Sequence, residues 1–350
     1  MGAVMPMSRL IFRATVACLG LLAACCMAEF SAPAQAQSLK KIKVTVPTAA
    51  LSFYPLYYAQ EKGIFAKEGL DVEVISTNGD GPDVDAVLSG SVPFAISTPN
   101  RLFTAFEQGK TLKAVAQTIS RMSIECAINK QVAEKLGITE AMPLDEKIKL
   151  MKGLTVGGTR PGAFTYLLLE TYARRAGLVP QKDLKIIGVG GVNSMLPAVE
   201  NNQIAIGCTG SPFIELAVKR GKAIRFTNNA NGNDPAFDGF MYHIVHARPD
   251  FVEKEPDTVR HFLRGWFTAI EQIMTTPSES HLTAIKARFG GSPDDVLLES
   301  FENIKKVFDR SGRITPESVQ KAAKFMTENG VVKSTPTFEQ IATNDFLPKR

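Results

Sequence analysis

The sequence predicts an α/β protein built from two similar lobes, and three observations support this prediction. One segment pattern occurs twice, at residues 86–99 and 198–211, and each copy combines a helix end, a polar turn, a short apolar strand and small hydroxyl residues. Strand-like and helix-like segments alternate along most of the chain, which favours a largely parallel sheet covered by helices. From residue 256 onward the pattern is helical. Because two similar lobes commonly bind a solute between them, we expect a binding protein before an enzyme.

The N-terminal residues 1–36 are predicted to be a signal peptide for export to the periplasm. Arg9 and Arg13 form a basic start, and the apolar run 14–27 is shorter than the roughly 18 residues of a membrane span. Ala-Gln-Ala at 34–36 matches a cleavage site, so we favour a soluble product cleaved near Ala36. Leu-Ala-Ala-Cys at 22–25 resembles a lipoprotein signal, so lipid anchoring at Cys25 stays open.

Charge and cysteine content narrow the class of protein further. The 350-residue chain has a formal net charge of +5. No basic run is interleaved with aromatic residues, so nucleic acid is not an expected partner. Beyond the signal only Cys126 and Cys208 remain, which excludes a disulfide scaffold. Both lie in strand-like runs, and we interpret them as buried free thiols, with a disulfide as the alternative.

The first lobe is predicted to begin with residues 38–122. Pro55 suits a first helical turn and Gly63 can end that helix, so a helix follows the strand at 41–46. The remaining expected elements are strands at 70–76, 94–97 and 112–118, a helix across 86–88, and a helix at 100–108.

The second lobe is predicted over residues 123–245, after which residues 246–350 return to the first lobe. Expected strands lie at 124–128, 154–157, 184–189, 204–208, 222–226 and 240–246, and expected helices at 164–176, 195–201 and 212–220. The Asn- and Gly-rich stretch 228–235 is expected to be a surface loop. Helices are expected from 256 and over 280–289, 294–308 and 316–328, and the last twenty residues are expected to wrap irregularly onto the first lobe.

Candidate ligand contacts follow from the general geometry of such sheets, in which ligands lie beyond the carboxyl ends of the strands. The loops expected there are short and rich in hydroxyl groups. The candidates are Ser52, Phe53, Tyr54, Ser97, Thr98, Arg160, Gly162, Ala163, Phe164, Thr165, Asn193, Thr209 and Ser211.

The strongest candidate is the helix start at residues 158–165. Backbone amides near Ala163 and Phe164 can hold an acidic group, because the helix dipole adds partial positive charge there. Thr165 can add a hydroxyl donor, and Arg160 offers a fork that matches a carboxylate or sulfonate. The alternative is a solvated loop. Similarly, the hydroxyl groups at the other loops are as easily helix caps as ligand contacts, whereas Phe53 and Tyr54 provide an aromatic wall.

Metal and catalytic sites are not expected. His243 and His246 lie three apart in a predicted strand, so their side chains point to opposite faces. The glycine-rich stretch 188–191 lacks the complete dinucleotide fingerprint. We therefore predict no catalytic residue, no metal and no cofactor, and hence no enzyme.

Residues 55–72, which read PLYYAQEKGIFAKEGLDV, resemble the signature of periplasmic solute-binding proteins that serve ABC importers. The branch is the one that handles sulfonates, taurine, nitrate and thiamine-pyrimidine precursors. Supporting segments lie at 88–90, 109–116, 152–157 and 176–178. The resemblance implies a type II periplasmic-binding-protein fold, with two hinge strands, a C-terminal helical segment and an inner-membrane ABC permease as partner. Pro93 and Ala205 stand where the family often has an acidic residue, and the cysteine-rich loop of pyrimidine-precursor binders is absent.

Together these features predict a monomeric extracytoplasmic receptor that captures a small anionic organic solute, sulfonate- or carboxylate-like, by hinge closure. Two alternatives stay open: a sensory receptor for a membrane signalling protein, and a pyrimidine-precursor-type enzyme on the same scaffold.

Overall fold

The computed structural model describes residues 38–77 and 79–349. The elements described below belong to the compact unit Leu39–Arg350. The predicted signal peptide, its cleavage near Ala36 and the lipid site at Cys25 lie outside the described residues. Among the helices of the described ranges, none has both the length and the apolar character needed to cross a membrane.

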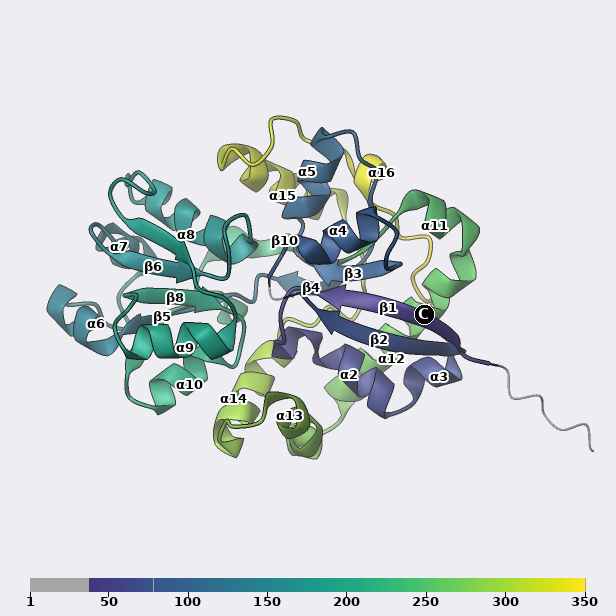
Figure 1. Ribbon diagram of the computed structural model, residues 1–350, viewed down its shortest axis with the longest axis horizontal. Coiled ribbons are helices and arrows are strands. Elements are labelled where there is room, and N and C mark those ends of the chain that lie inside the picture. Colours follow the sequence, from purple (N-terminus) through teal and green to yellow (C-terminus); the bar gives the residue numbers. More distant parts are fainter. Residues whose placement is uncertain (1–37, 78, 350) are drawn as a thin grey trace, which may run out of the picture. The chain divides into compact units, whose positions relative to one another are not determined.

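The first sheet has five strands in the order β2-β1-β3-β10-β4 (Figure 1). They are β1 (Lys40–Val46), β2 (Leu70–Ser76), β3 (Phe94–Ser97), β4 (Lys113–Arg121) and β10 (Asp238–Ala247). Strand β1 pairs in parallel with β2 and β3, whereas β10 is antiparallel to β3 and β4. All four residues of β3 are buried, as expected of a central strand that is covered on both faces.

The second sheet repeats this arrangement in the order β7-β6-β8-β5-β9. Its strands are β5 (Glu125–Asn129), β6 (Thr155–Gly158), β7 (Lys185–Gly188), β8 (Ile206–Thr209) and β9 (Ala223–Asn228). Again the first three strands are parallel, and the fourth, β5, is antiparallel to both neighbours. The repeated sequence pattern thus supplies the third strand of each sheet, β3 and β8, and the predicted two-lobed α/β fold is confirmed.

Two short crossings connect the sheets. Residues 122–124 lead from β4 to β5, and residues 229–237 lead from β9 back to β10. Arg121 precedes the first crossing and Asp238 follows the second, and the Nε atom of Arg121 contacts the Oδ1 atom of Asp238 at 2.8 Å. Because β10 lies in the first sheet from Asp238 onward, we propose lobe 2 as residues 123–237 rather than 123–245. Lobe 1 then comprises residues 39–122 and 238–350.

Most helices of lobe 1 pack around the first sheet, whereas residues 294–305 also contact residues 213–219 of lobe 2. They are α2 (Tyr54–Glu61), α3 (Ile64–Lys67), α4 (Pro82–Leu88), α5 (Asn100–Glu107), α11 (Pro249–Lys254), α12 (Pro256–Thr275), α13 (Leu282–Phe289), α14 (Asp294–Lys305), α15 (Pro316–Glu328) and α16 (Phe338–Ile341). The apolar face of α12 is buried as predicted, and Phe262 stacks between Phe65 and Phe94 with ring centroids 5.5 and 4.6 Å away. The C-terminal tail does pack on lobe 1, since the Thr343 amide donates to the Ala114 carbonyl at the edge of the sheet.

Five helices cover the second sheet: α6 (Lys130–Leu136), α7 (Leu144–Lys149), α8 (Phe164–Arg175), α9 (Val192–Glu200) and α10 (Phe213–Lys219). Figure 1 shows α7 and α8 on one face and α9 and α10 on the other. The sequence analysis did not predict α6 or α7.

The prediction that residues 228–235 form a surface loop was wrong, because much of this segment is buried. Asn228, Asn229, Ala230 and Asp234 are all at most 3% exposed. Their polar groups are used inside the protein: the Asn228 side chain accepts from the Asn231 amide, and Asp234 accepts from Arg175 at 2.6 Å. An Asn-rich segment can therefore be buried when its amide groups find partners within the fold.

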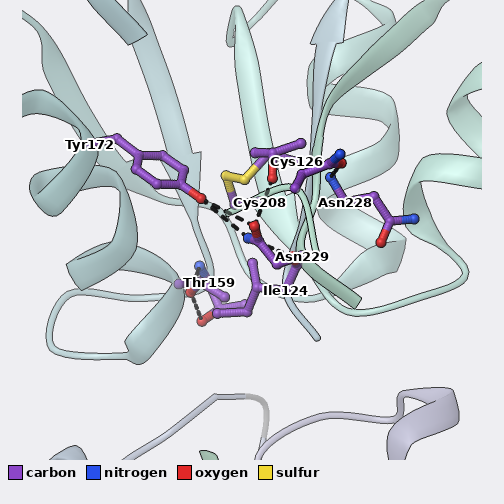
Figure 2. The surroundings of a disulfide bond; sticks show 10 residues. Ile124, Cys126, Thr159, Tyr172, Cys208, Asn228 and Asn229 are labelled. Carbon is purple, nitrogen blue, oxygen red and sulfur yellow. Dashed lines mark hydrogen bonds between the residues drawn. A yellow bond between two sulfur atoms is a disulfide. The ribbon is translucent and has the colours of Figure 1, made fainter. Parts of the chain in front are cut away.

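A disulfide joins Cys126 and Cys208, so the interpretation as two free thiols was wrong (Figure 2). Strands β5 and β8 are antiparallel, and their register places Cys126 directly opposite Cys208 with Cα atoms 4.1 Å apart. Directly opposed residues of neighbouring strands have Cβ atoms near enough for a bridge. The bond lies beside the crossing segment 122–124 and the end of β8, both of which reach the site described below.

We expect the disulfide to be a large contribution to stability. The two cysteines are 82 residues apart, and closing a loop of that length stabilises by about 4 kcal/mol in the chain-entropy account. The double variant Cys126→Ala/Cys208→Ala should unfold at clearly lower urea concentration than the oxidised protein. Dithiothreitol should lower the midpoint of the wild type and leave that of the double variant unchanged. Equal midpoints for oxidised and reduced wild type would contradict the expectation.

Candidate functional site

A cavity of about 40 Å³ lies between the two lobes. Space for one water needs about 10–15 Å³, so the cavity admits a small solute in this arrangement of the lobes. Both sheets contribute to its wall. The lining residues are Pro47, Thr48, Ala50, Ser52, Phe53, Gly79, Asp80, Thr98, Ser123, Ile124, Thr159, Phe164, Thr165, Thr209, Gly210, Tyr242 and His243.

The position of the cavity follows from the sheet topology. Residues 47–53, 79–80 and 98 follow the carboxyl ends of β1, β2 and β3, and residues 159 and 209–210 follow or end β6 and β8. The carboxyl ends of parallel strands meet at one edge of a sheet, where ligands of such folds bind. The crossing residues Ser123 and Ile124 form the base between the two edges.

Of the thirteen predicted contact residues, six line the cavity: Ser52, Phe53, Thr98, Phe164, Thr165 and Thr209. Their contact with a ligand stays a prediction. The others lie elsewhere. Tyr54 is buried in lobe 1, where its ring packs on Tyr58, His281 and Phe301. Asn193 is exposed, and Ala163 is buried outside the lining set.

Three further predicted residues hold the structure around the cavity rather than lining it. Ser97 donates from its hydroxyl to Asp80 at 3.2 Å. The Gly162 carbonyl accepts from the Asn100 side chain at 2.9 Å, which joins the two lobes. The Ser211 carbonyl accepts from the Leu51 amide at 3.4 Å, which joins them a second time.

The predicted anion site at the start of α8 is occupied by the chain's own carboxylate. Asp80, from the loop after β2, accepts a hydrogen bond from the Phe164 amide at 2.8 Å. Its other oxygen accepts from Ser97 at 3.2 Å. A carboxylate at a helix N-terminus satisfies amides that have no partner within the helix and is favoured by the dipole. The Phe164 amide was among the predicted donors, whereas Asp80, which comes from the opposite lobe, was not foreseen from the sequence.

Arg160 and Thr165 likewise serve this loop and the helix start. The Arg160 guanidinium donates to the Thr77 carbonyl at 3.4 Å and lies against Gly79, where a Cβ would be 2.6 Å from Arg160 Nε. Gly79 has φ 131°, a conformation that also requires glycine. The Thr165 hydroxyl accepts from the Thr159 amide at 2.9 Å. Arg160 thus donates within the protein itself, and the Thr165 hydroxyl also contacts the Thr159 hydroxyl at 2.7 Å, where either group can donate.

Burial shifts the pKa values of the ionisable groups in the wall. Burial raises the pKa of Asp80 above its usual value, while hydrogen bonds from Phe164, Ser97 and Thr98 and the charge of Arg160 act in the opposite direction. Burial lowers the pKa of His243 to about 3, with a smaller effect of His246, so His243 is neutral at physiological pH. Among the lining residues, all of which are described, no lysine or arginine occurs.

Aromatic rings form one side of the cavity. The imidazole of His243 stacks between Phe53 and Tyr242, with ring centroids 4.9 and 4.3 Å away. His243 Nδ1 is buried and has no hydrogen-bond partner among the described residues. A buried polar atom without a partner is costly and marks a position where a ligand or water can bind. The sequence analysis considered His243 only as a metal ligand and missed this position on the wall.

A buried hydrogen-bond network around Asn229 holds the backbone of Ile124, which lines the cavity (Figure 2). Asn229 Nδ2 donates to the Ile124 carbonyl at 3.1 Å and to the Tyr172 hydroxyl at 3.2 Å. Thr227 donates to Asn229 Oδ1 at 2.9 Å. This network and the disulfide hold the crossing segment against lobe 2.

A second buried carboxyl, Asp83, lies beside Asp80 without reaching the cavity. Burial and the nearby Asp80 raise the pKa of Asp83 to about 6. Asp83 Oδ1 accepts from the Gly81 amide at 2.7 Å, whereas Oδ2 has no partner among the described residues. Between about pH 4 and pH 6 the folded protein therefore keeps a proton that the unfolded chain has lost. This contribution to stability is complete below pH 4 and is lost as the pH rises through 6.

The variant Asp83→Asn should accordingly be more stable than the wild type at pH 7.5, by on the order of 1–3 kcal/mol. The amide carbonyl still accepts from Gly81, and no charge remains to be buried. The advantage should shrink towards pH 4, where the wild type is protonated. Urea unfolding at both pH values measures this, with Asp85→Asn as an exposed control. A variant that is less stable at pH 7.5 by the same amount as at pH 4 would refute this account.

The two sheets of equal topology and the cavity between them define an α/β protein with the periplasmic-binding-protein fold. The chain belongs to the NMT1/THI5-like family, whose model matches residues 50–280. It is similar to the putative binding protein YtlA of Bacillus subtilis, with 23% identity over 80% of each chain. It is 24% identical to the 4-amino-5-hydroxymethyl-2-methylpyrimidine phosphate synthase of Schizosaccharomyces pombe, covering 84% of this chain and 82% of that protein.

Solved structures share the fold. A protein from Bordetella bronchiseptica has a TM-score of 0.76 and 19% identity, with 88% of this chain and 96% of the other covered. The periplasmic nitrate-binding protein NrtA of Synechocystis has a TM-score of 0.67 and 20% identity, over 88% and 87% of the two chains. The aliphatic sulphonate binding protein SsuA of Escherichia coli has a TM-score of 0.64 and 14% identity, over 87% and 98%. The predicted branch of binding proteins is confirmed at the level of fold and family.

Proposed function

We propose that the protein is an exported, monomeric solute receptor of an ABC-type importer. It captures one small solute between its lobes and presents the closed form to a permease in the inner membrane. The observation that carries the proposal is the cavity itself, which is walled by the strand ends of both lobes. Family membership and the names of YtlA, NrtA and SsuA support a binding role.

Closure of the lobes is the proposed mechanism. Hydrogen bonds that join them around the cavity include Phe164 to Asp80, Asn100 to Gly162, Leu51 to Ser211 and Arg160 to Thr77. Since the cavity wall is complete only when both edges are together, a solute that contacts both lobes favours the closed state over an open one. The crossings at 122–124 and 229–237 are the proposed hinges, and a few residues of this kind suffice to absorb the motion.

An enzymatic role on the same scaffold is the second candidate, because one relative is named as a pyrimidine phosphate synthase. It differs from the receptor in one measurable respect: an enzyme converts what it binds. The anionic solute that the sequence favoured is not part of the proposal, since Asp80 already occupies the start of α8.

The receptor proposal predicts stabilisation by a small solute without turnover. The purified protein is to be screened by thermal shift against sulfonates, nitrate, carboxylates, amino acids, amines and pyrimidines. A solute at a hundred times its dissociation constant adds about 2.7 kcal/mol of stability. Each solute that binds should be recovered chemically unchanged, whereas a recovered product would favour the enzyme.

A cavity variant localises the binding. Thr209→Val keeps the shape of a buried wall residue and removes its hydroxyl, so it should weaken a bound solute about three- to ten-fold. Thr327→Val makes the same change on α15, outside the cavity, and should have no effect on affinity. Equal affinity of the wild type and Thr209→Val for every solute that binds would place the site elsewhere.

A further inference from the structure

We propose that Asp80 determines the charge selectivity of the cavity: it favours a small solute that presents a protonated or N–H-bearing nitrogen and excludes carboxylates and sulfonates. This inference rests on the proposed function and concerns the same cavity. It reverses the charge that the sequence predicted for the solute.

The first argument is the placement of Asp80. Its carboxylate is buried, lines the cavity and accepts from the Phe164 amide and the Ser97 hydroxyl through different oxygens. A carboxylate can accept about four hydrogen bonds. The bonds from the protein hold the group in position while acceptor capacity remains for a ligand. A donor on the solute can therefore complete the coordination of Asp80.

The second argument is the exclusion of anions. The amides of the α8 start are the donors best suited to an anion in this wall, and Asp80 occupies the amide of Phe164. Arg160 lies against Gly79 and donates to Thr77, outside the lining of the cavity. An anionic solute would approach a buried carboxylate with no lysine or arginine in the lining, and the charge of Arg160 outside the lining already acts on Asp80 itself. Like charges at close range in a poorly solvated site repel strongly.

The third argument is the remaining wall, which suits an uncharged or cationic group. Phe53 and Tyr242 are aromatic residues of the lining, and aromatic faces attract cations. His243 Nδ1, buried and without a partner among the described residues, provides a further neutral polar contact. Asp80 and the aromatic residues of the same wall are complementary to a small amine or an amino-substituted ring.

The test compares probes that share a skeleton and differ in charge: benzylamine with benzoate, and methylamine with acetate and methanesulfonate. Affinities are measured by calorimetry and thermal shift for the wild type. Asp80→Asn removes the charge, Asp80→Ala also frees the Phe164 amide, and Asp85→Asn is the matched control. Asp85 lies on the same helix α4 as Asp83, is exposed and pairs with Arg101 at 3.1 Å.

We expect the wild type and Asp85→Asn to bind the amine of a set and not its acid. Asp80→Asn should lose about ten- to a hundred-fold in amine affinity, the effect of removing a charged hydrogen-bond partner. Asp80→Ala should gain measurable affinity for benzoate or methanesulfonate, a result that a merely structural role of Asp80 would not produce.

A pH titration of the wild type tests the proposal even if both Asp80 variants fail to fold. Burial raises the pKa of Asp80, so benzylamine, which stays protonated, should bind more tightly as the pH rises and Asp80 ionises. Asp83, with its pKa of about 6, ionises in the same direction and adds to the effect. His243 stays neutral above about pH 3, and burial holds the pKa of Tyr242 well above its usual value, so neither group changes its charge in this titration. Benzylamine affinity that does not rise with pH counts against the proposal.

The outcomes separate this inference from the proposed function. Acids that bind the wild type as tightly as the amines, or amine affinity unchanged in Asp80→Asn, would overturn the inference. If an acid binds and Thr209→Val weakens it, the receptor function stands and only the charge selectivity is rejected. If no probe and no solute of the wider screen binds, both proposals are rejected.

Discussion

The hydrogen bond from the Phe164 amide to Asp80 is the contact on which the arrangement of the site depends. It joins the loop after β2 in lobe 1 to the start of α8 in lobe 2, with 2.8 Å between the two atoms. A buried carboxylate needs such donors, because its charge is otherwise unsolvated. The contact therefore closes one side of the cavity and fixes the sign of the charge inside it.

Neighbouring residues position the buried Asp80 carboxylate and stabilise its contact with Phe164. Gly79 adopts a backbone conformation that admits Arg160 behind the loop, and Ser97 at the end of β3 supplies a second donor. On the lobe 2 side, the disulfide and the Asn229 network hold the base that faces it. Asp83 lowers the free energy of unfolding when it is ionised, since its buried carboxyl has one oxygen without a partner among the described residues.

The sequence predicted those elements that are encoded by a pattern of neighbouring residues. The strand 94–97 and its counterpart in β8, the helix 316–328 and the α8 start were predictable from periodicity, proline positions and small residues. Helix α6 was missed although a local signal exists, because Asn129 caps it by accepting from the amides of residues 131 and 132. That helix could have been found.

Other features depend on tertiary contacts that no local pattern encodes. The spacing of Cys126 and Cys208 does not reveal that β5 and β8 are antiparallel neighbours. Similarly, the loop containing Asp80 was recognised as a loop, but its contact lies 84 residues further along the chain. The predicted anion site lacked this contact: the Phe164 amide was identified as a donor, and its internal acceptor was not.

The most direct measurement is the NMR signal of the Phe164 amide in the unliganded protein as a function of pH. The account predicts a slowly exchanging amide proton, shifted downfield, that titrates with a carboxyl pKa above the ordinary value of about 4 for aspartate. An amide that exchanges as fast as an exposed one and does not respond to carboxyl titration would contradict it.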